Sequence, residues 1–597
     1  MSTIELQTST NENFTQYSKD EYSSFDNAWQ EILGFIDYGD RFKRNVIRLG
    51  VCVPEACTAA DLETSLQREM DRILLPHQLK ARIEVHPNLC STDKDLQPFE
   101  IGYYITGGLI GLLLLAVSLS TTYHLIVLVR DTQDNKTCLE VITIFSAIRN
   151  GRDLIKYNRN NDLNIYNGLK VTILMVVLFT HKYTYFVINP ILYPKLVEEV
   201  YTVGPHFPLT IANIVDPFFF ITGYLVYIMM IPQFTKPGCQ WFHIPFVIVY
   251  KYLRTLPIYI ILMLLTTFVI PHLGDGPFWA NKMWLEADKC KTHWWTNLLA
   301  VSNFIQVEKQ CLVAGWYISC VIQLLAIGTI IIYIYVKKPK IGVYIMVLML
   351  IMSLTIRFAV TYHTKSYGII KFMISSTENP LSSYEYSNLY TQIYMRGIPF
   401  YAGLLAGVAA DALKQREIKI STTTTYVSTA VIIVICMYVQ MYGMTFYERR
   451  RQYDAIESAI YGTLSNCTWT VIFFWIAICH TISSYGPIEK LFNNRFAVPL
   501  GRLSYSVYLV NITVMMMIEN SKRTSATPTM GMLQNEWIIG VSKTYLAAVA
   551  LYLIVEAPIG LLIKKIIVGS KFSNQLDVDK TIRTNAKSVG QSDTTKL

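Results

Sequence analysis

Two ionisable side chains follow an apolar stretch that resembles a membrane helix. Asn167-Gly168-Leu169-Lys170 comes first, the apolar run 171–180 follows, and His181 and Lys182 come directly after it. The apolar part is about half of the ~20 residues that a membrane span needs, so both groups would lie within the hydrocarbon. An ionisable group at mid-bilayer costs roughly 2.5–3.5 kcal/mol on insertion scales and usually faces a cavity. His181 is therefore the first candidate for function.

Lys170 belongs to the same helix face as His181. The two residues are eleven positions apart, about three turns at 3.6 residues each, with a rise of roughly 16 Å between them. One face would carry a cation near one membrane surface and an imidazole near the middle of the bilayer.

The composition indicates the class of protein that holds this helix. The 597 residues are 52% hydrophobic and 16% charged, against a usual charged share of about 25%. Long apolar runs recur from Ile101 to Leu562 and do not alternate as barrel strands would, so the fold class is an all-α, polytopic membrane bundle. The net charge of +9 is spread over loops, and no basic cluster interleaved with aromatics suggests nucleic acid.

The apolar runs predict about eleven transmembrane helices. The first covers about 103–129, with an acidic flank before it and a basic loop after it, which places the N-terminus outside and the C-terminal tail in the cytosol. We expect the others near 169–189, 208–231, 244–270, 314–336, 341–362, 394–411, 423–446, 463–484, 497–518 and 538–566.

These helices divide the chain into five regions. We expect an extracytoplasmic domain at 1–100, the first helix at 101–130, a cytosolic linker at 131–165, the main membrane domain of about ten helices at 166–567 and a disordered cytosolic tail at 568–597. No cleavable signal peptide is visible. Asn13-Phe14-Thr15 is a glycosylation sequon, which fits either the endoplasmic reticulum or the plasma membrane.

Cysteines outside the membrane indicate an oxidising compartment. The N-terminal region holds Cys52, Cys57 and Cys90, which could form a disulfide or remain free thiols, and Asp61 through Ile73 has the spacing of a small amphipathic helix. In the loop 271–312 we expect Cys290 and Cys311 to pair with each other. We expect the other cysteines to be packing residues, and the sequence predicts no metal site.

Several further charges lie inside the predicted helices. Asp216 precedes Pro217, which breaks a helix and frees a carbonyl, and this combination favours a site. Arg254 begins its helix on the cytosolic side, where it could simply anchor that end. The remaining three could form structural ion pairs or line a polar interior that binds a substrate; they are Arg357, Arg396 and Glu556.

The order of these motifs resembles the insect and nematode "nose resistant to fluoxetine" proteins, membrane members of the acyltransferase 3 family. The resemblance covers Leu49 to about Ile567, and the earlier part of the N-terminal domain looks shortened. Its motifs are Gly50-Val51-Cys52-Val53-Pro54 with Cys57, Lys170 with His181, the segment Asp216–Gly223, Arg254 with Pro257, Cys311 with Trp316-Tyr317 and Gln323, Arg396 with Pro399 and Gly403, Pro499 through Leu509, and Glu556-Ala557-Pro558.

The resemblance implies an O-acyltransferase that moves an acyl group from a donor such as acyl-CoA to a hydroxyl acceptor, with no bound cofactor and with membrane lipids as partners. His181 would be the general base or the transient acyl carrier. Asp216 would orient the imidazole or balance its charge. Lys170 and Arg254 would bind the anionic donor, and Arg357, Arg396 and Glu556 would contribute to substrate or donor binding.

Three positions depart from the family pattern. Lys170 replaces an arginine and loses the bidentate fork, Val321 lies where an acid is expected, and Asn511 replaces a histidine. An alternative is therefore a catalytically weakened relative that binds or transports lipids or small hydrophobic molecules.

Overall fold

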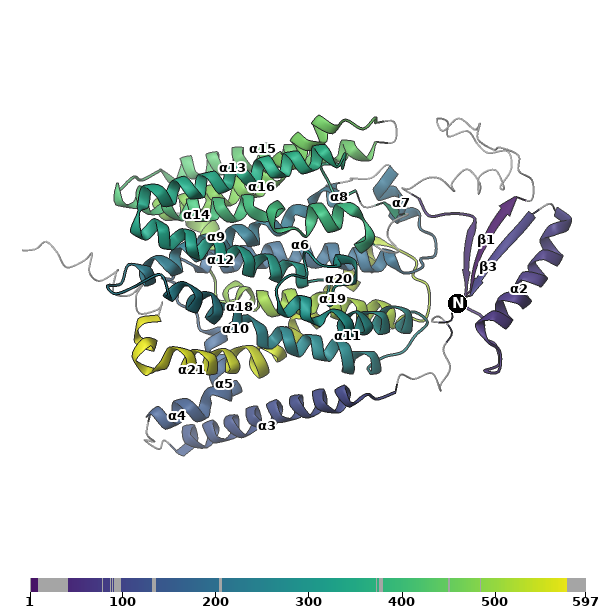
Figure 1. Ribbon diagram of the computed structural model, residues 1–597, viewed down its shortest axis with the longest axis horizontal. Coiled ribbons are helices and arrows are strands. Elements are labelled where there is room, and N and C mark those ends of the chain that lie inside the picture. Colours follow the sequence, from purple (N-terminus) through teal and green to yellow (C-terminus); the bar gives the residue numbers. More distant parts are fainter. Residues whose placement is uncertain are drawn as a thin grey trace, which may run out of the picture.

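The computed structural model shows a long helical bundle with a small α/β domain at one end (Figure 1). It describes residues 2–8, 41–77, 79–85, 87, 90, 98–130, 136–202, 207–371, 373–374, 380–448, 451–483 and 485–576. The predicted sequon at Asn13 lies outside these residues.

The N-terminal domain is a three-stranded antiparallel sheet backed by one helix. The strand order is β2-β1-β3, from β1 (Ser2–Thr8), β2 (Val46–Leu49) and β3 (Leu79–Val85), and these strands were not predicted. The predicted amphipathic helix is confirmed as α2 (Ala59–Leu74), whose N-terminus is closed by a capping box between Thr58 and Asp61. Its apolar side chains pack on the buried residues Ala81, Ile83 and Val85 of β3.

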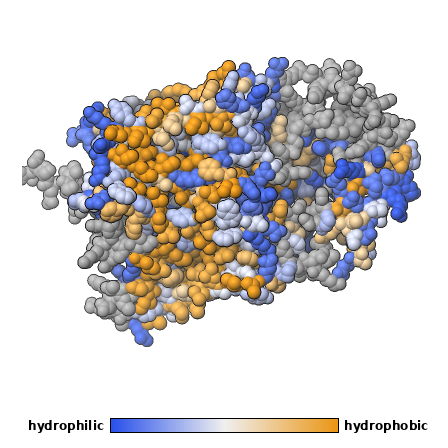
Figure 2. Space-filling view, in the orientation of Figure 1, coloured by the Kyte–Doolittle hydropathy of each residue, from blue (hydrophilic) through white to orange (hydrophobic). Residues whose placement is uncertain are grey.

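Ten helical segments are long and apolar enough to cross a membrane, among the residues that the structure describes. The space-filling view shows the result, an apolar belt across the bundle with polar surface on both sides of it (Figure 2). The segments are α3 (Ile101–Arg130), α6 (Asn164–Ile188), η4 with α9 (Ile211–Phe234), α10 with η5 and η6 (His243–His272), α12 (Gly315–Lys337), α13 (Pro339–His363), η11 with α14 (Glu385–Gln415), α15 with η12 (Thr422–Tyr447), α16 (Ala455–Ile482) and α20 with η13 and α21 (Met530–Ile566).

The tenth predicted span, 497–518, is two consecutive helices instead of one. The short α18 (Ala497–Arg502) ends at Leu503, and α19 (Ser504–Asn520) continues for 17 residues. Both pack against α6, so this segment is an internal wall of the bundle.

The C-terminal prediction needs a correction. The helix α21 runs from Ala557 to Leu576, so residues 568–576 of the expected disordered tail are helical. Once a helix has formed, each further residue adds a backbone hydrogen bond, so the helix of the last span continues past the predicted boundary. The rest of the tail lies outside the described residues.

The predicted cytosolic linker forms short helices that pack against α3. They are α4 (Lys136–Ile142), η3 (Thr143–Phe145) and α5 (Ala147–Ile155). The hydroxyl of Ser120 donates to the Ile142 carbonyl at 2.7 Å, and Arg502 donates to the Leu154 and Lys156 carbonyls at 2.8 and 2.7 Å. Arg502 thereby supplies the free carbonyls at the end of α5 with a partner.

Two glycines let α9 (Asp216–Phe234) and α14 (Ile393–Gln415) approach each other closely. A Cβ on Gly223 would lie 2.1 Å from the Phe400 carbonyl oxygen, and one on Gly403 would lie 2.3 Å from that of Phe220. Small residues at such a crossing allow close backbone contact in membrane helix pairs. This contact determines where Asp216 and Arg396 meet.

The second disulfide prediction is confirmed. Cys290 of α11 (Leu285–Leu298) is bonded to Cys311, and Lys291 pairs with Glu100 at 2.6 Å, which places this loop at the same end as the N-terminal domain. Cys52 and Cys57 are exposed and are not bonded to each other in the described part of the chain. Cys90 is also exposed, and the expected disulfide of the N-terminal region stays a prediction.

Candidate functional site

The helix α6 carries Lys170 and His181 without a break, as predicted. Its N-terminal end is held by close backbone packing: a Cβ on Gly168 would lie 2.3 Å from the Phe492 carbonyl oxygen, and one on Gly501 would lie 2.3 Å from that of Asn167. The glycine of the Asn167–Lys170 motif therefore seats α6 against α17 (Gly486–Phe492) and α18. This packing determines the position of the His181 side chain along the bundle.

His181 is hydrogen-bonded to Asn511 of α19. The imidazole Nδ1 lies 2.7 Å from the Asn511 Oδ1. The Asn511 amide nitrogen donates to two backbone carbonyls, those of Val507, at 3.2 Å, and Tyr508. The Oδ1 is therefore the acceptor, the proton lies on Nδ1, and the His181 Nε2 keeps its lone pair. This is the tautomer that a general base requires.

Asn511 is fully buried, and the helix that carries it is held by aromatic packing. One turn before it, Tyr508 packs against Tyr317 of α12 with ring centroids 4.6 Å apart, and Tyr317 packs against Phe219 at 4.9 Å. The residue type of Asn511 by itself indicates only the loss of a histidine. The structure shows that it orients the imidazole.

Asp216 does not take the orienting role that the resemblance implied. It is fully buried and accepts a hydrogen bond from Arg396 at 2.7 Å. The Nε of Arg396 donates to the Tyr390 carbonyl at 2.9 Å, and its guanidinium lies 4.3 Å from the Tyr390 ring centroid. The close approach of α9 and α14 brings acid and base together, so the pair belongs to that helix crossing.

Arg357 completes this cluster from α13. It donates to the Leu389 carbonyl at 2.9 Å and lies beside Arg396 and Asp216. The two arginines thus hold adjacent carbonyls at the end of the π-helical turn η11 (Glu385–Tyr390). Arg357 and Arg396 are buried and have protein partners, and their predicted role in donor binding stays a prediction.

Glu556 and Arg254 lie at the opposite end of the bundle from the N-terminal domain. Glu556 accepts a hydrogen bond from Ser506. Arg254 is exposed and interacts electrostatically with the Glu556 carboxylate. Tyr505 donates to the Thr255 carbonyl at 2.8 Å. The Pro499–Leu509 and Glu556 motifs therefore meet near Arg254, at the end of the bundle where Lys170 also lies.

Lys170 and Val321 differ in what surrounds them. Lys170 is half-buried and has neither a hydrogen bond nor an ion pair to any residue that the structure describes. Val321 packs against an apolar cluster between α9, α12 and α14. Val321 thus fills its position by apolar packing where the family has an acid. The ammonium group of Lys170 is not neutralised by any described carboxylate, so it can bind an anion.

Lys182 forms an ion-pair network that the sequence did not predict. Its ammonium group contacts Glu519 of α19 and, at 2.7 Å, Glu536 of α20 (Met530–Leu551). Lys522 pairs with the same two carboxylates at 2.9 and 3.0 Å. One feature of the sequence could have indicated this network: both glutamates lie at the edges of predicted spans, next to apolar sequence.

Comparisons with known proteins identify the family of this chain. The family profile described as "Acyltransferase domain", of the acyltransferase 3 group, matches residues 163–556. The chain belongs to the acyltransferase 3 family. The matched region includes the His181–Asn511 pair, the Asp216–Arg396 pair and Glu556.

One relative extends the similarity beyond that region. The chain is 22% identical over 519 residues to "Nose resistant to fluoxetine protein 6" of Caenorhabditis elegans, which covers 80% of this chain and 61% of that protein. The chain therefore spans about three fifths of the length of this relative. No solved structure gives a match.

No metal centre is found in the described residues. Among them, no group of three or more histidine, cysteine, aspartate or glutamate side chains could hold a metal ion.

Proposed function

We propose that this protein is a membrane O-acyltransferase that moves an acyl group from acyl-CoA, or a similar thioester donor, to a hydroxyl acceptor. The observation that carries the proposal is the His181–Asn511 hydrogen bond of 2.7 Å. Because Asn511 binds the proton on Nδ1, the Nε2 of His181 is free to accept the proton of an alcohol. The membership in the acyltransferase 3 family supports the same reaction.

The proposed step balances without a metal or a redox partner. The acceptor oxygen attacks the thioester carbonyl carbon while the His181 Nε2 takes the hydroxyl proton. The bond between the carbonyl carbon and sulfur breaks, and the imidazolium returns the proton to the leaving thiolate. The products are an ester and the free thiol of coenzyme A.

The donor would enter at the end of the bundle that holds Lys170 and Arg254. Both side chains are cationic, Lys170 is half-buried and without a described partner, and Arg254 is exposed, so they can attract the phosphates of a coenzyme A. We propose that this end faces the cytosol and that the N-terminal domain and the disulfide face the lumen or the cell exterior. The basic linker after the first span and the oxidising environment that a disulfide requires support this orientation.

A labelled-donor assay tests the proposal. Purified full-length protein in lipid vesicles is incubated with radiolabelled acetyl-CoA or palmitoyl-CoA and a mixture of lipid alcohols. We expect labelled esters with wild type and a loss of about a hundredfold or more with His181→Gln, the range for removal of a general base. A matched control is His124→Gln in α3. The Nδ1 of His124 is hydrogen-bonded to the Ser146 hydroxyl at 2.8 Å, and this pair does not belong to the candidate site. Equal labelling by wild type and His181→Gln would contradict the proposal.

A second candidate is a lipid carrier that keeps the scaffold without catalysis. The observation that favours it is that the partner of His181 is a neutral amide, which cannot balance the charge of an imidazolium as a carboxylate can. A carrier would tolerate His181→Gln and move labelled lipid between vesicles equally well. An enzyme would lose its product with the same variant, so one substitution separates the two functions.

A further inference from the structure

Three positive charges gather where the N-terminal domain meets the loop that carries the disulfide. Lys282 belongs to the π-helical turn η7 (Ala280–Trp284), which continues directly into α11. Lys289 follows about two turns later on α11. Arg48 comes from strand β2 of the N-terminal domain. We call these three residues the cationic site.

Lys282 has no counter-ion. Its side chain is half-buried, and its ammonium group makes no hydrogen bond or ion pair to any residue that the structure describes. The charges that act on it are those of Lys289 and Arg48. Burial and, to a smaller extent, these two cations lower the pKa of the Lys282 ammonium group. A half-buried cation beside like charges is unfavourable unless an anion joins it.

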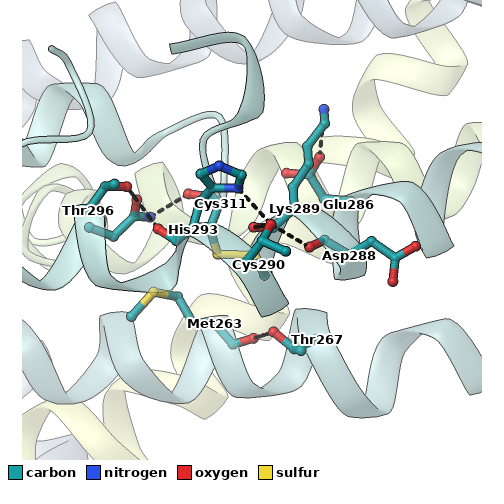
Figure 3. Close-up of a disulfide and its surroundings, with 11 residues drawn as sticks. Met263, Thr267, Glu286, Asp288, Lys289, Cys290, His293, Thr296 and Cys311 are labelled. Atoms are coloured by element: carbon teal, nitrogen blue, oxygen red, sulfur yellow. Dashed lines mark hydrogen bonds and ion pairs between the residues drawn. A yellow bond between two sulfur atoms is a disulfide. The ribbon is translucent and has the colours of Figure 1, made fainter. Parts of the chain in front are cut away.

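The carboxylate one turn after Lys282 does not neutralise the cationic site. Glu286 is 5% exposed, and its Oε2 pairs with the Lys289 ammonium at 3.4 Å. Figure 3 shows this pair beside the Cys290–Cys311 disulfide. Glu286 forms no ion pair with Lys282 among the described contacts. Three cations thus share one carboxylate, and the site keeps an excess of positive charge.

Both sides of the cationic site are held in place. Glu198 of α7 (Lys195–Thr202) accepts hydrogen bonds from the Phe42 N–H at 3.0 Å and from the Arg44 guanidinium at 2.7 Å. These contacts fasten the segment that leads into β2 to the membrane domain. On the other side, the disulfide fastens α11 to the segment that leads into α12. A site built on fixed elements needs little reorganisation to bind a ligand.

The outer face of α11 indicates the level of the cationic site in the membrane. Leu285, Trp294 and Trp295 are 51%, 50% and 39% exposed, and tryptophans are enriched at the level of the lipid headgroups. Lys282 and Lys289 lie on the same helical segment, toward the end that carries the N-terminal domain. The site therefore lies near the headgroups of one leaflet.

We propose that the cationic site binds a phosphate group, and that this group belongs to the headgroup of an anionic phospholipid such as phosphatidic acid. A phosphate has enough oxygens to accept hydrogen bonds from a guanidinium and two ammonium groups. A soluble phosphate ester carries the same group, but the level of the site favours the lipid. The proposal does not depend on acyl transfer.

Lipid binding by the full-length protein tests the proposal. Native mass spectrometry in detergent measures the affinity for dioleoyl phosphatidic acid, with dioleoyl phosphatidylcholine as the comparison because its choline balances the phosphate charge. Lys282→Gln should weaken binding of phosphatidic acid about tenfold or more, the change for loss of a hydrogen bond between charged groups. Lys282→Arg should retain it. Lys309→Gln is the matched control, since it removes the same charge from an exposed position of the same loop.

Thermal unfolding shows whether the variants are folded. Because Lys282 has no described partner, Lys282→Gln without lipid should unfold at the wild-type temperature or above it. Phosphatidic acid should raise the unfolding temperature of the wild type and of Lys309→Gln but not of Lys282→Gln, because a ligand stabilises the folded state that binds it.

Three outcomes would overturn the proposal. Equal affinity of wild type and Lys282→Gln for phosphatidic acid would remove the site, and so would a loss for Lys309→Gln as large as that for Lys282→Gln. If glycerol 3-phosphate binds as tightly as phosphatidic acid, the ligand is a soluble phosphate ester and the lipid assignment is wrong. None of these results bears on acyl transfer, which His181→Gln tests.

Discussion

Two buried charge clusters in this protein are built on different principles. The first joins Asp216 to Arg396 and Arg357, with the Asp216 and Arg396 side chains 0% and 2% exposed. The second joins Lys182 to Glu519, Glu536 and Lys522, and its members range from 2% exposed for Lys182 to 24% for Lys522. One cluster is sealed inside a helix crossing, and the other opens toward solvent at one side.

The charge balance of the two clusters also differs. Two arginines and one aspartate leave the first cluster with one uncompensated positive charge, which the Leu389 and Tyr390 carbonyls and the faces of Trp316 and Tyr390 surround. Two lysines and two glutamates make the second cluster neutral. A buried ion pair is rarely a net source of stability, but loss of one partner is costly. The sealed cluster should therefore respond more strongly to substitution than the open one.

Asp216→Leu should have the largest effect. Without the carboxylate, two buried guanidinium groups face each other, and we expect a loss of about 3–5 kcal/mol in the free energy of unfolding. Tryptophan fluorescence during thermal unfolding in detergent measures it, with Asp216→Glu as the conservative control. An unchanged midpoint for Asp216→Leu would remove the distinction between the clusters.

Lys182→Met should lower the free energy of unfolding by about 2–3 kcal/mol, which lies between the losses for buried and for exposed ion pairs. The loss is intermediate because Lys522 still contacts both glutamates. The double variant Lys182→Met/Glu519→Leu should recover part of that loss in the same unfolding measurement. Full additivity of the two single changes would show that the residues do not act as a network.

Gly223→Ala tests whether the sealed cluster depends on the helix crossing. The added methyl group would meet the Phe400 carbonyl at 2.1 Å, and overpacking of this kind costs about 1–3 kcal/mol. Gly107→Ala in α3 is the control, since no atom lies within 4 Å of its Cβ position. If both variants have the wild-type unfolding midpoint, the glycine does not position Asp216.

Lys522→Met should have the smallest effect on the free energy of unfolding, about 0–1 kcal/mol, because its side chain is 24% exposed. The neighbouring Arg523→Met, whose side chain is 70% exposed beside Asp275, should have no measurable effect on unfolding. A loss for Lys522→Met as large as that for Lys182→Met would show that the second cluster is sealed after all.

Much of the fold followed from local patterns in the chain. Runs such as Gly315–Lys337 are apolar for longer than a soluble helix requires, so their membrane helices were predictable. The segment 497–518 was less so, because hydropathy does not show that Leu503 separates two helices. The three strands of the N-terminal domain were missed for a similar reason, since strand pairing is made between residues far apart in the chain.

The candidate site shows the same division. His181 was identifiable because an imidazole inside an apolar run is costly unless it has a task. Its partner was not, since Asn511 is 330 positions away and its residue type alone indicated only a lost histidine. The resemblance implies that Asp216 orients His181 or balances its charge, whereas the packing of α9 on α14 pairs it with Arg396.

The amino-acid sequence by itself determined the membrane class, the approximate helices, the polar face of Lys170 and His181 and the cysteines of the disulfide, because each depends on local composition and spacing. Only the tertiary structure decided the proton position on His181 and the partners of Asp216 and Lys182. Those features depend on which helices are neighbours, and the close approach of backbones at Gly168 and Gly223 sets that arrangement.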